Sequence, residues 1–312
     1  MRARLSMLWA ACALLAALAL AGFRVGERPG SLSGWQALVL GAVQGATELL
    51  PVSSSGHLIL VPWLADWTSL KENPALNKTF DVALHLGTLV AVVTYFSGEA
   101  ARLAVAFARS LCARRAESED ERLAWIVAIA TVPAVLVGAA GESVVERRLG
   151  EPWQIALLLG LFALVLFAVD RRATGRSVSD LSYREGLVLG VAQALALAPG
   201  VSRSGIVISA ARLLRLDRDA AARISFLLLI PVVLGASVYK GISDVLLVGL
   251  PPGSAGPFLV GMLAAAGTGM AAISGLLGYV RHHTYGVFVL YRLAVALLVL
   301  ALISAGLRAA TF

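Results

Sequence analysis

The chain has 312 residues, of which 59% are hydrophobic and only 14% are charged. Ordinary soluble domains have about 25% charged residues, so this composition leaves too little polar surface to cover a soluble domain of this length. We therefore expect an all-α polytopic membrane protein. The net charge of +7 is carried mostly by arginines in short connecting segments. Such arginines indicate membrane topology and contact with anionic lipid headgroups, and they argue against a nucleic-acid partner.

An apolar run opens the chain at residues 5–22, behind Arg2 and Arg4. A basic start followed by a short apolar core is also typical of a signal peptide, so cleavage stays open. We favour a retained extra transmembrane helix within an N-terminal segment 1–30, followed by a membrane domain over 31–312.

Residues 35–64 are apolar at both ends and polar in the middle. The middle reads Gln44-Gly-Ala-Thr-Glu48-Leu-Leu-Pro-Val-Ser-Ser54-Ser-Gly-His57. A helix broken at membrane depth is stable only where protein buries it or where it lines a wet cavity. An intramembrane carboxylate such as Glu48 is a functional-site hypothesis by default. We therefore predict a re-entrant hairpin whose tip carries chemistry.

Six further segments are each near the ~20 apolar residues needed to cross about 30 Å of hydrocarbon. These predicted spans are 80–97, 124–141, 153–169, 223–242, 258–280 and 286–309. Short arginine-rich loops stay cytoplasmic, which places the loops after the first span, after the third and before the fourth inside. The first hairpin then enters from outside, a second dipping segment at 184–211 enters from inside, and the C-terminus lies outside. Residues 142–152 are predicted as an outer loop.

The two dipping segments share one sequence pattern. Leu38-Val39-Leu40-Gly41 recurs as Leu187-Val188-Leu189-Gly190, and at the same offset Gln44, Val52, Ser53, Ser55 and Gly56 meet Gln193, Val201, Ser202, Ser204 and Gly205. Related halves at about 35–145 and about 184–280, with hairpins entering from opposite faces, form an inverted-topology repeat. In such folds the site lies near the midplane, where the broken helices meet.

The halves differ at the positions suited to chemistry. Arg203 offers a rigid fork of donors for phosphate oxygens, and the Gly/Ser turn around it adds backbone N–H groups. Glu48 and Gln44 present oxygens one helical turn apart, which together with a diphosphate suits Mg²⁺. Ser54 and His57 lie three residues apart and form the minimum pair for nucleophilic catalysis. The combination favours phosphoryl transfer.

Structural roles are the alternatives for several of these residues. An Arg203–Glu48 ion pair would lock the repeats together, and Gln44 would hydrogen bond between helices. Ser53 and Ser55 would cap helices and hold the hairpin turn.

Three further polar residues lie inside predicted spans. Asp81 and His85, four residues apart, are predicted to support the site rather than to react. Arg292 is an intramembrane charge with no partner evident from the sequence. Close helix packing is the predicted role of several glycines. They are Gly235, Gly261, Gly267, Gly269, Gly275 and Gly278.

The motifs resemble the bacterial undecaprenyl pyrophosphate phosphatase family, the bacitracin-resistance protein type, over roughly residues 35–310. The resemblance is carried by the 44–57 stretch, by Pro199-Gly-Val-Ser-Arg203-Ser-Gly, and by Ile224-Ser-Phe-Leu-Leu followed by Pro231. It implies six core spanning helices, two re-entrant hairpins, and hydrolysis of undecaprenyl pyrophosphate to the monophosphate carrier of cell-wall synthesis. It also implies a divalent cation (Mg²⁺ or Ca²⁺) and an active site facing the outer side of the bacterial plasma membrane.

The family's roles carry over by position. Glu48 and Gln44 would bind metal and diphosphate, Ser54 would be nucleophile or phosphate ligand, His57 would be acid/base, and Arg203 with Ser202 would bind phosphate, with Ser53, Ser55 and Ser204 also at the substrate. Two positions depart from the family pattern. Gln44 replaces an acidic residue, and Ile206-Val207 replaces the usual Ala-Thr, which removes a hydroxyl expected near the phosphates.

Two other functions fit part of the pattern. A polyprenyl-phosphate flippase or transporter would also use an inverted repeat with broken helices. An intramembrane serine protease would use Ser54 and His57, although a guanidinium suits phosphate better than a peptide bond. The expected partners are a polyprenyl diphosphate lipid, membrane lipids and a second copy of the chain in a homodimer.

Overall fold

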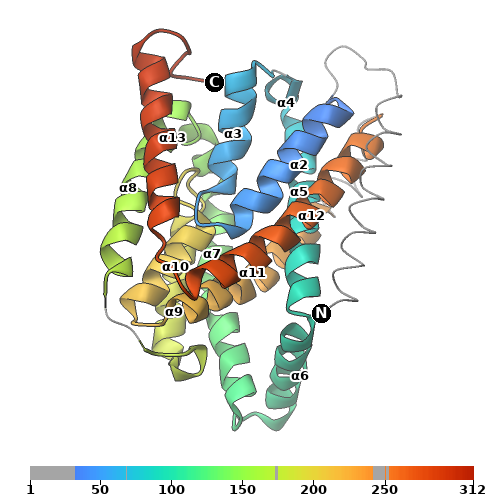
Figure 1. Cartoon of the computed structure of the whole chain (residues 1–312). Helices are drawn as coiled ribbons and strands as arrows, with labels where there is room; N and C mark the ends of the chain where they lie inside the picture. The colour runs from blue at the N-terminus through green and yellow to red at the C-terminus, as the bar shows by residue number, and fades with distance from the viewer. Residues whose placement is uncertain (1–31, 68, 173–174, 242–249, 251–252) are drawn as a thin grey trace.

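The computed structural model describes residues 32–67, 69–172, 175–241, 250 and 253–312 (Figure 1). Within these ranges the chain is helical and forms no β-strand, only one isolated bridge between Arg176 and Leu216. The helices are α2 (Gly34–Leu49), α3 (Ser54–Ala65), α4 (Ser69–Glu72), α5 (Pro74–Tyr95), α6 (Ser97–Ala113), α7 (Glu119–Arg148), α8 (Pro152–Asp170), η1 (Val178–Asp180), α9 (Tyr183–Leu195), α10 (Arg203–Leu213), α11 (Arg218–Lys240), α12 (Ala255–Val280) and α13 (Gly286–Ser304). The predicted helix at 5–22 lies outside the described residues.

Six of these helices are long and apolar enough to cross a membrane, which confirms the predicted all-α polytopic class and its six spans. They are the segments Leu76–Tyr95, Glu119–Gly141, Pro152–Asp170, Arg218–Lys240, Ala255–Val280 and Gly286–Ser304. Capping sets where they begin. Asp217 accepts from the Ala220 N–H at the start of α11, and Ser118 with Glu121 forms a capping box at the start of α7.

Two segments predicted as loops are helical. The arginine-rich connection after the first span contains α6, which buries Leu103, Ala106 and Ser110 and packs against α7. Its arginines obscured an amphipathic pattern. Likewise α7 continues through the first part of the predicted loop 142–152, because residues 142–149 contain no glycine or proline and the next glycine, Gly150, has a φ of +123°.

The two dipping segments are helical hairpins too short to cross the membrane. The helices α2, α3, α9 and α10 have 16, 12, 13 and 11 residues, so at 1.5 Å per residue the longest is about 24 Å. Each hairpin turns at a serine with the same unusual backbone, φ 76° at Ser53 and φ 73° at Ser202. Each serine then accepts a hydrogen bond from the N–H of a glycine three residues later. The repeat seen in the sequence is therefore a repeat of backbone geometry.

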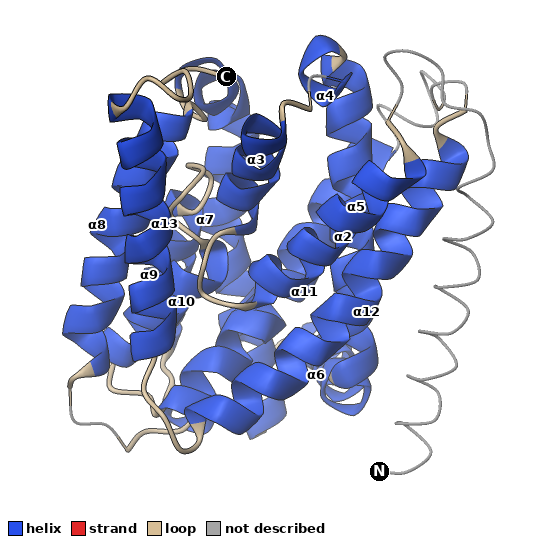
Figure 2. Ribbon diagram, turned by 45° about the horizontal axis from the view of Figure 1, so that its top comes forward, coloured by secondary structure: helices blue, strands red, loops and turns tan. Residues whose placement is uncertain are grey.

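Each hairpin packs mainly on a helix of the other half: α2 lies along α12, and α9 lies along α7 (Figures 1 and 2). A Cβ on Gly41 of α2 would lie 2.2 Å from the Gly261 carbonyl oxygen, and one on Gly190 of α9 would lie 2.6 Å from that of Ala130. Only glycine allows this backbone approach. The two halves are thus interlocked at equivalent points.

Five of the six glycines predicted at close helix contacts divide into two groups. Gly261 and Gly269 are tightly packed, as expected. The prediction is wrong for Gly235, Gly275 and Gly278, where an added Cβ would meet nothing within 4 Å. The reason is that these three helix positions do not lie at a crossing with a neighbouring helix.

The hairpins open at opposite ends of the helix bundle. The first opens beside the C-terminal segment, where Arg308 pairs with Asp66. The second opens at the other end, where Arg176 donates to Glu185 Oε1 at 2.6 Å and to the Leu214 carbonyl at 2.9 Å. This donation by Arg176 lowers the pKa of Glu185 to about 2. Between the two openings, the hairpin tips meet inside the bundle (Figure 2).

Candidate functional site

Glu48, near the end of α2, is the centre of the polar cluster at the hairpin tips. Its carboxylate is 6% exposed and accepts from both halves of the chain. Oε1 accepts from Arg203, and Oε2 accepts from the Ser54 hydroxyl and from Gln44 Nε2 at 3.5 Å. A carboxylate with this many donors is stable in a buried position. The site is therefore built around one anion of the protein.

Arg203, the first residue of α10, reaches across to that carboxylate with two donors. Nε and Nη2 lie 3.2 and 2.7 Å from Glu48 Oε1. The remaining nitrogen, Nη1, is buried and has no hydrogen-bond partner among the described residues. The structural ion pair weighed as the alternative is thus present, but it uses only part of the guanidinium and leaves a donor for another anion.

The predicted Ser54–His57 pair does not form. Ser54 donates to Glu48 instead. Both ring nitrogens of His57 have other partners, Nδ1 with the Ser53 carbonyl oxygen at 2.6 Å and Nε2 with the Tyr291 hydroxyl at 2.7 Å. The spacing in the sequence places Ser54 and His57 close together on α3. Each nevertheless bonds to a residue of another helix, Ser54 to Glu48 of α2 and His57 to Tyr291 of α13.

His57 is held in one tautomer. A carbonyl oxygen only accepts, so Nδ1 carries the hydrogen and, in the neutral ring, Nε2 accepts from Tyr291. The two rings stack with centroids 5.6 Å apart and planes inclined by 12°. Tyr291 was missed in the sequence. Its signal was a phenol directly before the intramembrane arginine of α13.

Arg292, unassigned from the sequence, holds the two hairpin tips together. It is fully buried and donates to four backbone carbonyls, those of Pro51, Leu159, Gly200 and Val201. The Pro51 carbonyl belongs to the tip of the first hairpin, and the Gly200 carbonyl belongs to the tip of the second. A buried cation without a carboxylate is stable here because carbonyl dipoles surround it. Arg292 is therefore a positioning residue.

The four predicted substrate-binding serines mostly hold the hairpins. Ser53 and Ser202 cap α3 and α10, and Ser53 Oγ also accepts from the Gly200 N–H at 3.1 Å. Ser204 donates to the Leu50 carbonyl at 2.8 Å, and Ser55 Oγ lies 3.5 Å from Ser53 Oγ. These bonds tie each tip to the other.

Oxygen and nitrogen donors for a cation lie beside Glu48. Gln44 is fully buried, and its Oε1 has no hydrogen-bond partner in the described part of the chain. His85 donates from Nδ1 to the Asp81 carbonyl, which leaves Nε2 facing Glu48 Oε2 at 3.9 Å. No set of three His, Cys, Asp or Glu side chains within the described ranges is arranged to hold a metal ion. Because Gln44, which has an unsatisfied side-chain oxygen, lies beside the Glu48 carboxylate, the residues fit a divalent cation completed by substrate oxygens.

The side chains of the cluster are largely buried. Two cavities, of about 420 and 450 Å³, lie elsewhere, and neither is lined by Glu48 or Arg203. Arg203 Nη1 is itself buried, so a ligand that reaches it must shift the side chains that cover it.

Comparison with known proteins shows the family of the chain. Residues 37–298 match the family model of the bacitracin resistance protein BacA. Proteins named undecaprenyl-diphosphatase are similar over most of their length. That of Geotalea daltonii is 40% identical over 274 residues (87% of this chain, 99% of the relative), that of Thermomicrobium roseum 42% over 279 residues (86% and 98%), and that of Rubrobacter xylanophilus 44% over 272 residues (86% and 97%). The chain belongs to the bacitracin resistance protein BacA family.

Proposed function

We propose that the chain is a membrane-embedded phosphatase that hydrolyses undecaprenyl diphosphate to undecaprenyl phosphate and inorganic phosphate. This reaction recycles the lipid carrier for peptidoglycan synthesis and gives resistance to bacitracin. The observation that carries the proposal is the meeting of Glu48, Ser54 and Arg203, from hairpins that open at opposite ends, in one buried cluster. The relatives named undecaprenyl-diphosphatase support the same activity.

The diphosphate would bind at Arg203. Its Nη1 is a buried donor without a partner among the described residues, and a phosphate oxygen satisfies such a donor with a charge-assisted hydrogen bond. The tip before it, Gly200 to Ser202, adds a turn with positive φ at both ends, 101° and 73°. As the phosphate approaches, it competes with Glu48 for the guanidinium, which frees the carboxylate for chemistry.

Ser54 and Glu48 form the nucleophile–base pair. Ser54 Oγ attacks the terminal phosphorus while Glu48 Oε2 accepts its proton, and the bond from phosphorus to the bridging oxygen breaks. Undecaprenyl phosphate leaves, and the phosphoserine is then hydrolysed by water. The hydrogen bond in the structure supports this assignment, since a base must lie within reach of the proton that it takes. The alternative, in which Ser54 only binds phosphate, remains an outcome of the tests below.

His57 would supply and take up protons. The ring can carry a second proton without moving, because the Tyr291 hydroxyl can turn and accept from Nε2 while Nδ1 keeps donating to the Ser53 carbonyl. This freedom suits a group that alternates between protonation states. Tyr291 is 43% exposed, so the pair extends from the Ser53 carbonyl at the first hairpin tip to the surface of the helix bundle.

Gln44 and Glu48 would hold a divalent cation, Mg²⁺ or Ca²⁺, with His85 as a further donor beside them. Such an ion, when bound, neutralises charge on the diphosphate. Substrate oxygens would complete its coordination, because the protein supplies few ligands itself.

The arginines support the orientation that we propose for the chain in the bacterial plasma membrane. Arginine-rich loops gather at the end where the second hairpin opens, around Arg172, Arg176, Arg215 and Arg281. The positive-inside tendency makes this end cytoplasmic, so the first hairpin and the C-terminus face outside. We propose that the site opens to that outer side. A homodimer stays a prediction, which molar-mass measurement in detergent can check.

Phosphate counting with purified protein tests the function. The full chain in detergent, given undecaprenyl diphosphate and Mg²⁺, is expected to release one inorganic phosphate per lipid. A flippase would release none and return the lipid intact. An intramembrane protease would leave the lipid intact and cleave a peptide.

A further inference from the structure

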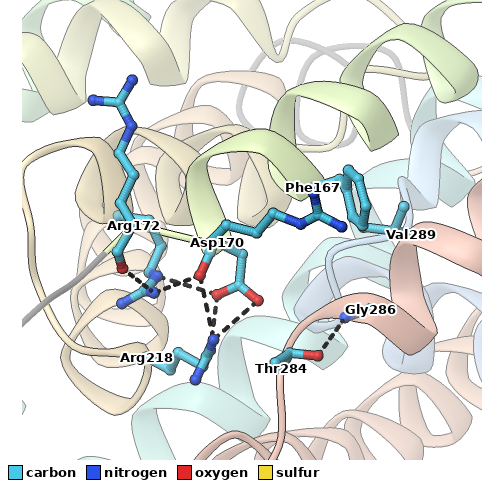
Figure 3. Close-up of a pocket in the computed structure, with 9 residues that line it drawn as sticks. Phe167, Asp170, Arg172, Arg218, Thr284, Gly286 and Val289 are labelled. Atoms are coloured by element: carbon cyan, nitrogen blue, oxygen red, sulfur yellow. Dashed lines mark hydrogen bonds and ion pairs between the residues drawn. The ribbon is translucent and has the colours of Figure 1, made fainter.

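A cavity lined by charged residues lies at the other end of α10 from the hairpin tips. Its volume is about 420 Å³, and it is formed where α8 ends, α10 ends, and α11 and α13 begin (Figure 3). Asp170 and Arg218 are the terminal residues of two candidate spans there. The cavity therefore lies at the membrane surface, at the end that carries the arginine-rich loops.

The charge of this cavity is strongly positive. Its lining includes four arginines, Arg171, Arg172, Arg212 and Arg218, and one acid, Asp170. One carboxylate against four guanidiniums leaves three positive charges uncompensated. Such an excess in a concave surface attracts anions.

The single carboxylate is already committed. Asp170 Oδ1 lies 2.8 Å from Arg218 Nε and 3.2 Å from Arg212 Nε, and Oδ2 accepts from the Tyr285 N–H at 3.0 Å. Figure 3 shows the Arg218 guanidinium directed at Asp170. Arg212, only 1% exposed, also donates to three backbone carbonyls. Asp170, Arg212 and Arg218 thus hold one another in place, and together they form the floor of the cavity.

The other two arginines are available. Arg171 lies over the Phe167 ring, its guanidinium carbon 3.9 Å from the ring centroid, and contact with a ring face leaves N–H groups of the guanidinium open. Arg172 is exposed and extends away from Asp170 (Figure 3). Neither forms an ion pair with any acidic side chain of the described residues. Neither guanidinium is therefore neutralised by a carboxylate, and Arg171, which lies over the lining residue Phe167, can donate to an anion in the cavity.

The wall beside them is apolar. Phe167 and Val289 line the cavity, and Phe167 is 40% exposed on a helix whose other outward residues include Leu164 and Leu161. A ligand with a charged head and an apolar tail would meet both surfaces at once. Basic pockets between transmembrane helices on the cytoplasmic side are suited to lipid phosphate groups.

We propose that this cavity is an anion site, which binds a phosphate group through Arg171 above the Asp170–Arg212–Arg218 floor, with the positive charge of Arg172 nearby adding attraction. The ligand chemistry is a phosphate oxyanion, carried by an anionic phospholipid headgroup or by free phosphate. The site is independent of the proposed hydrolase activity, because none of its residues lies in the Glu48 cluster.

The test uses the purified full chain in a neutral detergent and follows its melting temperature. Three probes are titrated separately: short-chain phosphatidylglycerol, short-chain phosphatidylcholine and inorganic phosphate. The variant R171Q/R172Q removes the two available arginines. The matched control R102Q/R109Q removes two exposed arginines of α6, which line neither cavity.

We expect saturable stabilisation of the wild type and of the control, with an apparent Kd about tenfold weaker in R171Q/R172Q, as loss of charge-assisted hydrogen bonds predicts. If only phosphatidylglycerol raises the melting temperature to a plateau, the ligand is a lipid headgroup. If inorganic phosphate does so as well, the site also takes free phosphate. The proposal is overturned if R171Q/R172Q responds as the wild type does, if the control loses as much affinity, or if phosphatidylcholine stabilises equally.

Discussion

Arg203 and Glu48, 155 residues apart in the chain, form a two-donor ion pair at the point where the hairpins meet, with Arg203 Nη2 2.7 Å from Glu48 Oε1. Both side chains are largely buried, at 14% and 6% exposure. The pair joins the two repeats, and it also places a phosphate-binding group against a base. Its structural and chemical roles can be separated by experiment.

Replacing one member of the pair leaves a buried charge alone. Arg203→Met is expected to destabilise the protein by about 3–5 kcal/mol, and the double variant E48Q/R203M is expected to recover most of that loss because both charges are gone. Melting temperatures in detergent measure this. Phosphate release should stay absent in the double variant. Activity that returns together with stability would show that the pair is only structural.

Ser54→Ala should lower phosphate release by about 10² or more, since the nucleophile–base pair is lost. The control is Ser209→Ala, which removes a buried hydroxyl that donates only to a carbonyl of its own helix. With lipid labelled at the terminal phosphate and an acid quench, the wild type is expected to carry label on Ser54. Normal turnover with no labelled serine would make Ser54 a phosphate ligand and water the nucleophile.

The interlocked helix crossings predict unequal effects of the same substitution. Gly41→Ala and Gly190→Ala would push a methyl group against backbone oxygen at 2.2 and 2.6 Å, and overpacking of this kind costs about 1–3 kcal/mol. Gly235→Ala, in open space on α11, should be neutral or stabilising by up to about 1 kcal/mol, because alanine favours helix. Thermal melting compares the three. Equal effects at all three positions would rule out the close approach.

Acid should weaken the start of the second hairpin. The pKa of Glu185 falls from 4.5 to about 2, first because Arg176 donates to it. A depressed pKa gives stability that is complete above the unfolded value and is lost as the pH falls from about 4.5 towards 2. The melting temperature of the wild type should therefore drop over this range relative to that of Glu185→Gln. Parallel pH curves for the two proteins would contradict this assignment.

Much of this arrangement was predictable from residue pattern. The polar middle of 35–64 and its repetition around Arg203 predicted two hairpins and a shared site, because polar groups inside apolar segments have few stable solutions. The sequence pattern could not identify the hydrogen-bond partners of these side chains. Ser54 pairs with Glu48 rather than with His57, and His57 pairs with Tyr291, because those choices depend on how α2 and α13 are oriented in space. Arg292 showed only as an unexplained charge, since its partners are backbone carbonyls, which no sequence displays.

Helix α6 and the continuation of α7 were missed for a different reason. A segment rich in arginine is predicted to be a loop at the membrane surface. An amphipathic helix that lies at that surface is also rich in arginine, so composition alone does not separate the two. Its buried stripe of Leu103, Ala106 and Ser110 has helical spacing, and that spacing was the available signal.

One measurement tests the central claim most directly: the initial rate of inorganic phosphate release from undecaprenyl diphosphate by purified wild type and by Arg203→Lys, with Arg102→Lys as the control. Lysine keeps the charge but removes the fork that reaches both Glu48 and a phosphate. We predict that Arg203→Lys loses about 10³-fold in rate, the scale of a transition-state arginine, while Arg102→Lys matches the wild type. Wild-type turnover by a folded Arg203→Lys variant would contradict the account.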